Sequence, residues 1–226
     1  MKILTLIFIT LFATACGEQT APIQKPQLQS VFILFENGGT IAEADQDDAR
    51  NTMLNLLQQL SEMDRRKATR NAQINIVLGA LPNRIAWSGT PRQLLEQVED
   101  IKALLTFKQS FNDLVMAFDQ IQTTINLTQP DDIRLYWIGS TVHVPFQDTG
   151  TAITVEVPQP VPDNLALSSF ADVLSVLKVY RVHEDQDQIL LAYFAAQGVL
   201  TRAREGSLDF SLFGSAQTKS SLSDLL

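Results

Sequence analysis

Cysteine and histidine are scarce in this sequence. Among its 226 residues, one is cysteine and two are histidine. A single cysteine excludes an intramolecular disulfide, even in an oxidising compartment. The 25 acidic residues outnumber the 17 basic ones and set the formal net charge at −8. This charge opposes nucleic acid and anionic lipid head groups alike, so neither is expected as a partner through bulk charge.

The common motifs for phosphate binding and for serine hydrolysis are also missing. The chain contains no G-x-x-x-x-G-K-[ST] and no G-x-G-x-x-G, the glycine patterns that cradle nucleotide phosphates. It also lacks the G-x-S-x-G pattern of a nucleophile elbow,. These absences exclude the usual nucleotide-binding loops and leave a hydrolase without its most recognisable signal.

The apolar stretch after Lys2, ILTLIFITLFATA, is too short and too closely followed by polar sequence to span a bilayer comfortably,. It ends in Ala13-Thr14-Ala15-Cys16. Small residues before a cysteine resemble the lipobox of bacterial lipoproteins, with Ala13 in the usual place of leucine. The resemblance implies that residues 1–15 are a signal peptide and that Cys16 is acylated, which anchors the protein without a transmembrane helix. The alternative is an ordinary secretory signal followed by a chance cysteine.

Residue Gly17 bears on the destination of such a lipoprotein. An Asp at this position would resemble the signal for retention in the inner membrane, so Gly17 favours the outer membrane. Residues 16–29 carry two prolines and several glutamines, and this composition indicates an extended tether between the anchor and the folded part,.

From residue 30 onward, apolar strand patterns alternate with helical ones. Residues 30–35 are apolar almost throughout, as in a central strand covered on both faces, and residues 41–64 follow with a helical period,. Further strands are expected at 74–81, 84–89, 133–139, 153–158 and 178–182. Further helices are expected at 91–105, 111–125, 167–177 and 185–198, and Ser110 is the expected cap of the second of these,. Residues 204–226 are rich in serine and are expected to form a mobile tail.

This alternation predicts an α/β fold of three layers, Rossmann-like, with a mostly parallel sheet and helices on both faces, over residues 30–203. Ligands of such sheets bind at the carboxyl ends of the strands. The stretch ENGGT, residues 36–40, lies at such an end. Its glycines allow a tight reversal with positive φ, and Thr40 can cap the following helix. A phosphate site is the rival interpretation, opposed by the charge of Glu36.

The order of these elements resembles a von Willebrand factor A-type domain. The resemblance is carried by the strand VFILFEN, the pair INIVLGALPNRIAW, the strand IRLYWIGS and the last unit KVYRVHEDQDQILLAYFAAQGV. It implies a protein-binding domain whose metal site follows the first strand as Asp-x-Ser-x-Ser, with a Thr and a second Asp from later loops.

The residues at the matching positions make a poor metal site. Glu36 stands for the first Asp, Gly38 and Thr40 for the two serines, and Ser110 or Thr106 for the Thr. The second Asp falls near Gly139-Ser140, where no carboxylate is present. One carboxylate and two hydroxyls are a weak ligand set for Mg²⁺, so we expect no metal and no cofactor.

A hydrolase is a further alternative to a binding protein, because the sequence contains two histidines that could act as a general base. His143 and His183 could each pair with a serine and an acid, although both are expected in loops or at the surface,.

The sequence thus predicts a lipid-anchored, non-catalytic envelope protein that binds other envelope proteins, such as those of a secretion or conjugation assembly. The alternatives are a metal-dependent adhesion domain and a secreted hydrolase. The expected binding surface comprises Glu36, Asn37, Gly38, Gly39, Thr40, Ser110, Gly139, Ser140 and His143.

Overall fold

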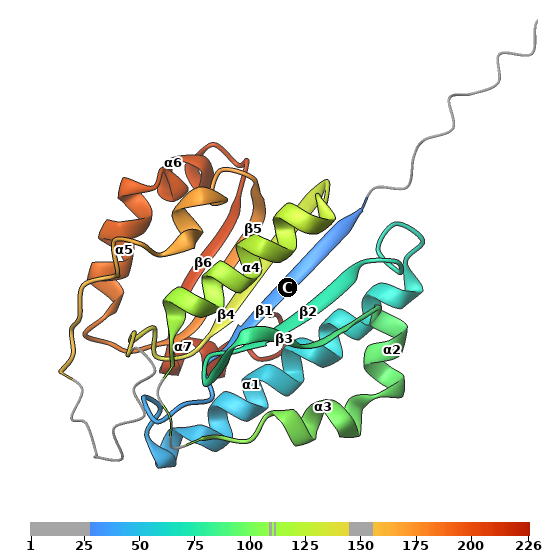
Figure 1. The fold of residues 1–226 in the computed structure, drawn as a ribbon, viewed down its shortest axis with the longest axis horizontal. Helices are drawn as coiled ribbons and strands as arrows, with labels where there is room; N and C mark the ends of the chain where they lie inside the picture. The colour runs from blue at the N-terminus through green and yellow to red at the C-terminus, as the bar shows by residue number, and fades with distance from the viewer. Residues whose placement is uncertain (1–27, 109, 111, 145–155) are drawn as a thin grey trace, which may run out of the picture.

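The structure is a computed structural model, and it describes residues 28–108, 110, 112–144 and 156–226. Its centre is a six-stranded sheet in the order β3-β2-β1-β4-β5-β6 (Figure 1). The strands are β1 (Gln29–Phe35), β2 (Gln73–Leu78), β3 (Leu81–Gly89), β4 (Asp132–Ile138), β5 (Leu174–Val182) and β6 (Asp209–Gly214). Every neighbouring pair is parallel except β2 and β3. The predicted α/β class and mostly parallel sheet are therefore confirmed.

Helices cover both faces of this sheet, as Figure 1 shows. The helical elements are α1 (Glu43–Ser61), η1 (Glu62–Arg65), α2 (Pro91–Glu96), α3 (Val98–Leu104), α4 (Leu114–Thr128), η2 (Ala166–Ser169), α5 (Asp187–Ala196), α6 (Val199–Arg204) and α7 (Ser215–Ser220). Within the described ranges, no helix is both long and apolar enough to cross a membrane.

The alternation of β1 divides the core into two clusters. Val31, Ile33 and Phe35 pack with α1, α2 and α3 on one face. Phe32 and Leu34 pack with α4 and α5 on the other. Because successive side chains of a strand point to opposite faces, a strand buried on both sides must be apolar throughout. The apolar run in this strand therefore reflects its central place in the sheet.

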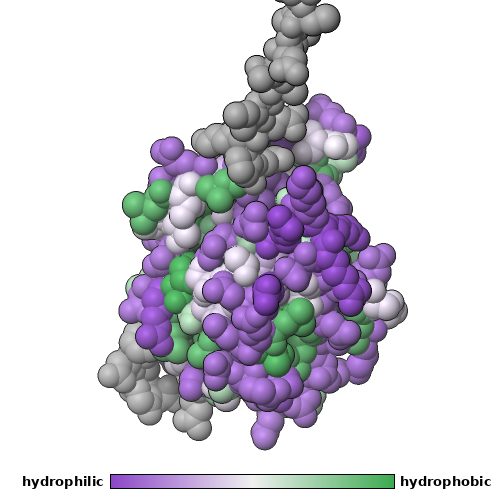
Figure 2. All heavy atoms as spheres, turned by 90° about the vertical axis from the view of Figure 1, so that its right-hand side faces the viewer, coloured by the Kyte–Doolittle hydropathy of each residue, from purple (hydrophilic) through white to green (hydrophobic). Residues whose placement is uncertain are grey.

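The outer surface over α2 and α3 is mainly hydrophilic. Figure 2 views the molecule from that side and shows hydrophobic side chains in separate patches. Leu95 and Val98 are the exposed hydrophobic residues of these two helices. Both residues line one cavity between α1, α2 and α3, together with Leu54, Leu57 and Ile101.

The chain between residues 166 and 182 differs from its predicted structure. We expected a helix over 167–177 and a strand over 178–182, but η2 ends at Ser169 and β5 already begins at Leu174. The strand is buried along almost its whole length because it lies between β4 and β6. Its apolar residues therefore satisfy two faces of a sheet, a pattern that a short buried helix shares.

The expected mobile tail, residues 204–226, is instead part of the fold. Helix α6 ends at Arg204, β6 then adds an edge strand parallel to β5, and α7 follows. Leu225 is fully buried, and its carbonyl accepts a hydrogen bond from the Tyr180 hydroxyl. The proposed signal peptide, Cys16 and the tether up to residue 27 lie outside the described residues. Of the strand expected at 153–158, residues 153–155 also lie outside them, and residues 156–158 form no strand.

Candidate functional site at the carboxyl edge of the sheet

The loops after β1, β2 and β4 meet at one edge of the sheet. Backbone pairing continues past the strands, since the amide of Glu36 donates to the Ile138 carbonyl at 2.9 Å. The amide of Gly79 donates to the Phe35 carbonyl, also at 2.9 Å. ENGGT therefore begins between two parallel neighbours, at the edge where such sheets bind ligands.

Glu36 is fully buried at the centre of this edge. Its Oε1 accepts from Trp137 Nε1 at 2.7 Å and from the Thr141 amide at 2.9 Å. Its Oε2 accepts from Ser140 Oγ at 3.0 Å and, more weakly, from Asn112 Nδ2 at 3.5 Å. Burial raises the pKa of this carboxyl to about 7, although the hydrogen bonds oppose the rise. The carboxyl group thus joins three segments of the chain from inside.

Gly139 makes room for the Glu36 side chain. A Cβ at this position would lie 2.3–2.5 Å from the Cβ, Cγ and Cδ of Glu36. No real pair of carbon atoms approaches so closely, so any other residue at position 139 must displace the glutamate. Glu36 therefore requires a glycine at position 139, close to where the family resemblance places its second Asp.

Asn112 is the residue at this edge that the sequence analysis missed. Its Oδ1 accepts from the Gly38 amide at 2.9 Å, so its Nδ2 must face Thr40 and Glu36. A backbone amide can only donate, which fixes this orientation. Gly79 lies against it, because a Cβ there would meet Asn112 Oδ1 at 2.5 Å. The available signal was the pair Asn112-Asp113 just before an apolar helix.

Asn37 holds the same loop from the other side. Its Oδ1 accepts from the Ala80 amide at 3.1 Å, and its Nδ2 donates to the Thr106 carbonyl at 3.0 Å. The Asn37 carbonyl accepts from the Lys108 amide at 2.7 Å. The two asparagines therefore link the loop after β1 to those after β2 and α3.

Only four of the nine residues of the expected binding surface are exposed to solvent. Five of its residues are buried, namely Glu36, Asn37, Gly38, Gly139 and Ser140. Gly39 is exposed, and Thr40, Ser110 and His143 are partly exposed. Glu36 is thus unable to meet a partner as an exposed charge, which corrects that expectation. The buried residues determine the shape of the edge, and the four others form what we call the edge surface.

Three local predictions about caps and turns are wrong. Positive φ occurs among the described glycines at Gly198 and Gly206, and not in the ENGGT turn. Thr40 caps no helix, because α1 starts after Ala42 without a side-chain cap. Asp113, and not Ser110, caps α4 by accepting from the Met116 amide at 3.0 Å. Ser110 instead accepts a hydrogen bond from the Gly39 amide on its carbonyl.

The residues of this edge do not fit the metal site that the family resemblance implies. Mg²⁺ favours near-ideal octahedral coordination by oxygen. Here Asn112 Nδ2, a donor, lies between Thr40 Oγ1 and Glu36 Oε2, and four donors already occupy the glutamate oxygens. Within the described residues, no three His, Cys, Asp or Glu side chains gather as metal ligands.

In the described part of the chain, neither histidine forms a hydrogen bond with a serine side chain, although His183 lines a cavity with Ser140 and Ser215. His143 Nδ1 accepts from the Leu114 amide, and His183 Nδ1 accepts from the Asp185 amide, both at 3.2 Å. Burial lowers the pKa of His143, while the charge of Asp113 acts in the opposite direction. The structure therefore does not assemble the predicted alternative of a serine, histidine and acid.

A cavity of about 190 Å³ opens beside the edge surface, between the loops after β1, β4 and β5. Thr40 and Ser140 line it together with Asp45, Arg181, His183 and Ser215. Arg181 was missed by the sequence analysis, although a charged residue inside the apolar strand KVYRV was a visible signal.

No protein-family model matches this sequence, and no curated protein does. Among solved structures, the chain is similar to the PilB minor pilin from Streptococcus sanguinis, with 12% identity, a TM-score of 0.46, and coverage of 92% of this chain and 64% of that one. A point mutant of that pilin gives 12% identity and a TM-score of 0.49, with coverage of 91% and 62%. The type V pili tip protein Mfa5 from Porphyromonas gingivalis, as three N-terminal domains, gives 10% identity and a TM-score of 0.40, with coverage of 65% and 26%. The chain spans less than two thirds of the length of these chains.

Proposed function

We propose that this protein is a non-catalytic envelope lipoprotein whose α/β domain binds other proteins through the carboxyl edge of its sheet. The observation that carries the proposal is the use of Glu36. The one acid at the centre of this edge is buried and braces three loops through Trp137, Ser140, Thr141 and Asn112. An acid enclosed in this way has no open position for a substrate or an attacking water.

The edge surface itself suits contact with a partner. Gly39 is exposed without a side chain, so a partner can approach the backbone there,. His143 contributes a partly exposed ring whose Nδ1 is held by α4. Because the loops are tied to one another from below, the surface is preorganised, which lowers the entropic cost of binding.

Site-specific photo-cross-linking in cells tests this role. A photoreactive amino acid at Gly39 or His143 should give discrete cross-linked products with another envelope protein. Leu127 is a matched control position, since it is 80% exposed and lies near the last turn of α4, away from the edge. Products from Leu127 equal to those from Gly39 and His143, or no products at the edge positions, would contradict the proposal.

A further inference from the structure

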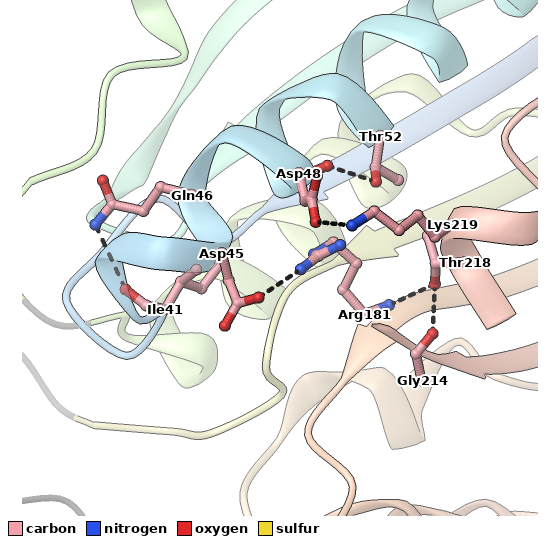
Figure 3. Close-up of polar contacts among 9 residues, drawn as sticks. All are labelled: Ile41, Asp45, Gln46, Asp48, Thr52, Arg181, Gly214, Thr218 and Lys219. Carbon is pink, nitrogen blue, oxygen red and sulfur yellow. Dashed lines mark hydrogen bonds and ion pairs between the residues drawn. The ribbon is translucent and has the colours of Figure 1, made fainter. Parts of the chain in front are cut away.

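Arg181 occupies an unusual place in β5. The pairing of β5 with β6 runs from Tyr180–Phe213 directly to Val182–Gly214, so Arg181 is the extra residue of a bulge. Its φ is +64°, in the left-handed region that non-glycine residues rarely adopt,. Bulges of this kind redirect a side chain beside functional sites. Here the bulge turns the arginine toward the amino-terminal end of α1 (Figure 3).

The carboxy-terminal helix holds this conformation in place. The Arg181 amide donates to Thr218 Oγ1 at 3.0 Å, and that hydroxyl donates in turn to the Gly214 carbonyl at 2.9 Å. Thr218 is fully buried. The uncommon backbone is therefore supported by two specific hydrogen bonds, as strained conformations at functional sites usually are.

The guanidinium is buried but poorly paired. The Arg181 side chain is 4% exposed, and its one hydrogen-bonded ion pair among the described residues is with Asp45, at 3.4 Å. Asp48, which pairs with Lys219, also acts on Arg181 through its charge. A guanidinium has five N–H donors, and charge-assisted hydrogen bonds are usually 2.7–2.9 Å long. The neighbouring Lys219–Asp48 pair, at 2.7 Å, shows a normal length (Figure 3). Within the described residues, the guanidinium therefore uses few of its donors, and its one hydrogen bond is long,.

Asp45 is a displaceable partner. Its side chain is 53% exposed, so it can turn to water when another carboxylate takes its place. The hydroxyls of Thr40 and Ser215 also line the cavity and can donate to the second oxygen of such a group, whereas the Ser140 hydroxyl already donates to Glu36. A volume of about 190 Å³ is below the usual range for whole small-molecule ligands and suits one side chain,.

From this geometry we infer that the Arg181 cavity receives the carboxylate of an Asp or Glu side chain from the bound protein partner, which replaces Asp45. The planar guanidinium matches a carboxylate in a two-pronged contact. Glu184, next to the cavity, opposes any anion, but it opposes a dianionic phosphate more strongly than a singly charged carboxylate,. This inference rests on the proposed function and names the chemistry of the partner.

The direct test uses N-acetyl-Gly-Asp-Gly-amide as a probe, with its Asn counterpart as the control. The Arg181 Nε–H signal is followed by NMR during the titration. We expect the Asp peptide to shift this signal saturably and the Asn peptide to leave it unchanged. Equal shifts with both peptides, or tighter binding of free acetate or inorganic phosphate than of the Asp peptide, would overturn the inference.

Two variants separate binding from folding. Asp45→Asn removes the internal competitor, so the probe should bind roughly twofold to fivefold more tightly, the range for a partly exposed ion pair. Asp47→Asn is the matched control, because Asp47 is 86% exposed and pairs with Arg50 instead. Arg181→Asn should abolish binding while keeping the left-handed backbone, which Asn tolerates. Equal affinities of the Asp45→Asn and wild-type proteins would overturn the inference.

The same variants distinguish this inference from the proposed function. Cross-links at Gly39 that are formed equally by wild type and by folded Arg181→Asn would leave the binding role intact and refute the carboxylate contact. Loss of those cross-links in Arg181→Asn, with retention in Asp47→Asn, supports both.

Discussion

At the scale of single residues, Glu36 shows how a carboxyl group becomes structural. Four donors converge on it, yet burial still favours its neutral form. The cost of enclosing its charge is borne by the folded state alone, because the unfolded chain exposes the same group to water. Between pH 5 and 8, the Glu36 carboxyl should therefore contribute to the pH dependence of stability,.

Replacing Glu36 by Gln should remove that contribution. The folded pKa of about 7 exceeds the ordinary value of 4.5, so the folded state binds the proton more tightly. Stability is then fully present below pH 4.5 and is lost as the pH rises toward 7 and above, by about 3 kcal/mol. Gln keeps an oxygen for Trp137 and Thr141 and carries no charge. In urea unfolding from pH 5 to 8, the Glu36→Gln protein should gain stability over wild type with rising pH.

Glu99→Gln is the control for this experiment, because Glu99 lies on the surface and pairs with Lys102. Its difference from wild type should stay nearly constant over the same pH range. A Glu36→Gln difference that is equally constant would show that the Glu36 carboxyl does not change its ionisation between these pH values.

Gly139 provides a second test at this scale. Gly139→Ala places a methyl group within 2.5 Å of Glu36 and should lower the free energy of unfolding by about 2 kcal/mol, as overpacking does,. Gly214→Ala is its match, since Gly214 also lies at the carboxyl end of a strand, but the nearest atom to an added Cβ is 3.8 Å away. Chemical denaturation should show a change below about 1 kcal/mol for the control. Equal losses would contradict the steric argument.

At the scale of elements, β6 and α7 complete the sheet and build the Arg181 cavity. Strand β6 covers the free edge of β5, and α7 supplies the hydroxyl that holds the Arg181 amide. The serine content that suggested a mobile tail reflects an edge strand and a short helix that face water on one side. Their stability comes from contacts with β5 and α1, which local composition does not encode.

Leu225→Ala tests the attachment of this segment. Leu225 is fully buried, so the substitution should cost about 3 kcal/mol of unfolding free energy,. Leu226→Ala is the control, because Leu226 is 37% exposed, and this substitution should change stability by less than about 0.5 kcal/mol,. Thermal or urea unfolding measures both. A mobile tail would make the two variants alike.

At the scale of the whole molecule, we propose that an acidic α/β domain is attached to the membrane by a lipid on Cys16. Cys16→Ser should move the protein from the membrane fraction to the soluble fraction and abolish its labelling by radioactive palmitate. Thr20→Ser, also in the expected tether, should change neither. Membrane association and labelling that persist in Cys16→Ser would refute the lipoprotein assignment.

The sequence alone determined the layered α/β class, because a strand covered on both faces must be apolar at every position and a helix at every third or fourth. It also placed ENGGT at the carboxyl edge, since strand order along the chain decides which loops meet. Tertiary structure alone decided what lies there. The enclosure of Glu36, the room that Gly139 leaves for it, and the bulge that turns Arg181 depend on neighbours 37 to 105 residues away along the chain. Such contacts leave no local pattern, because burial and distance arise only when the chain has folded.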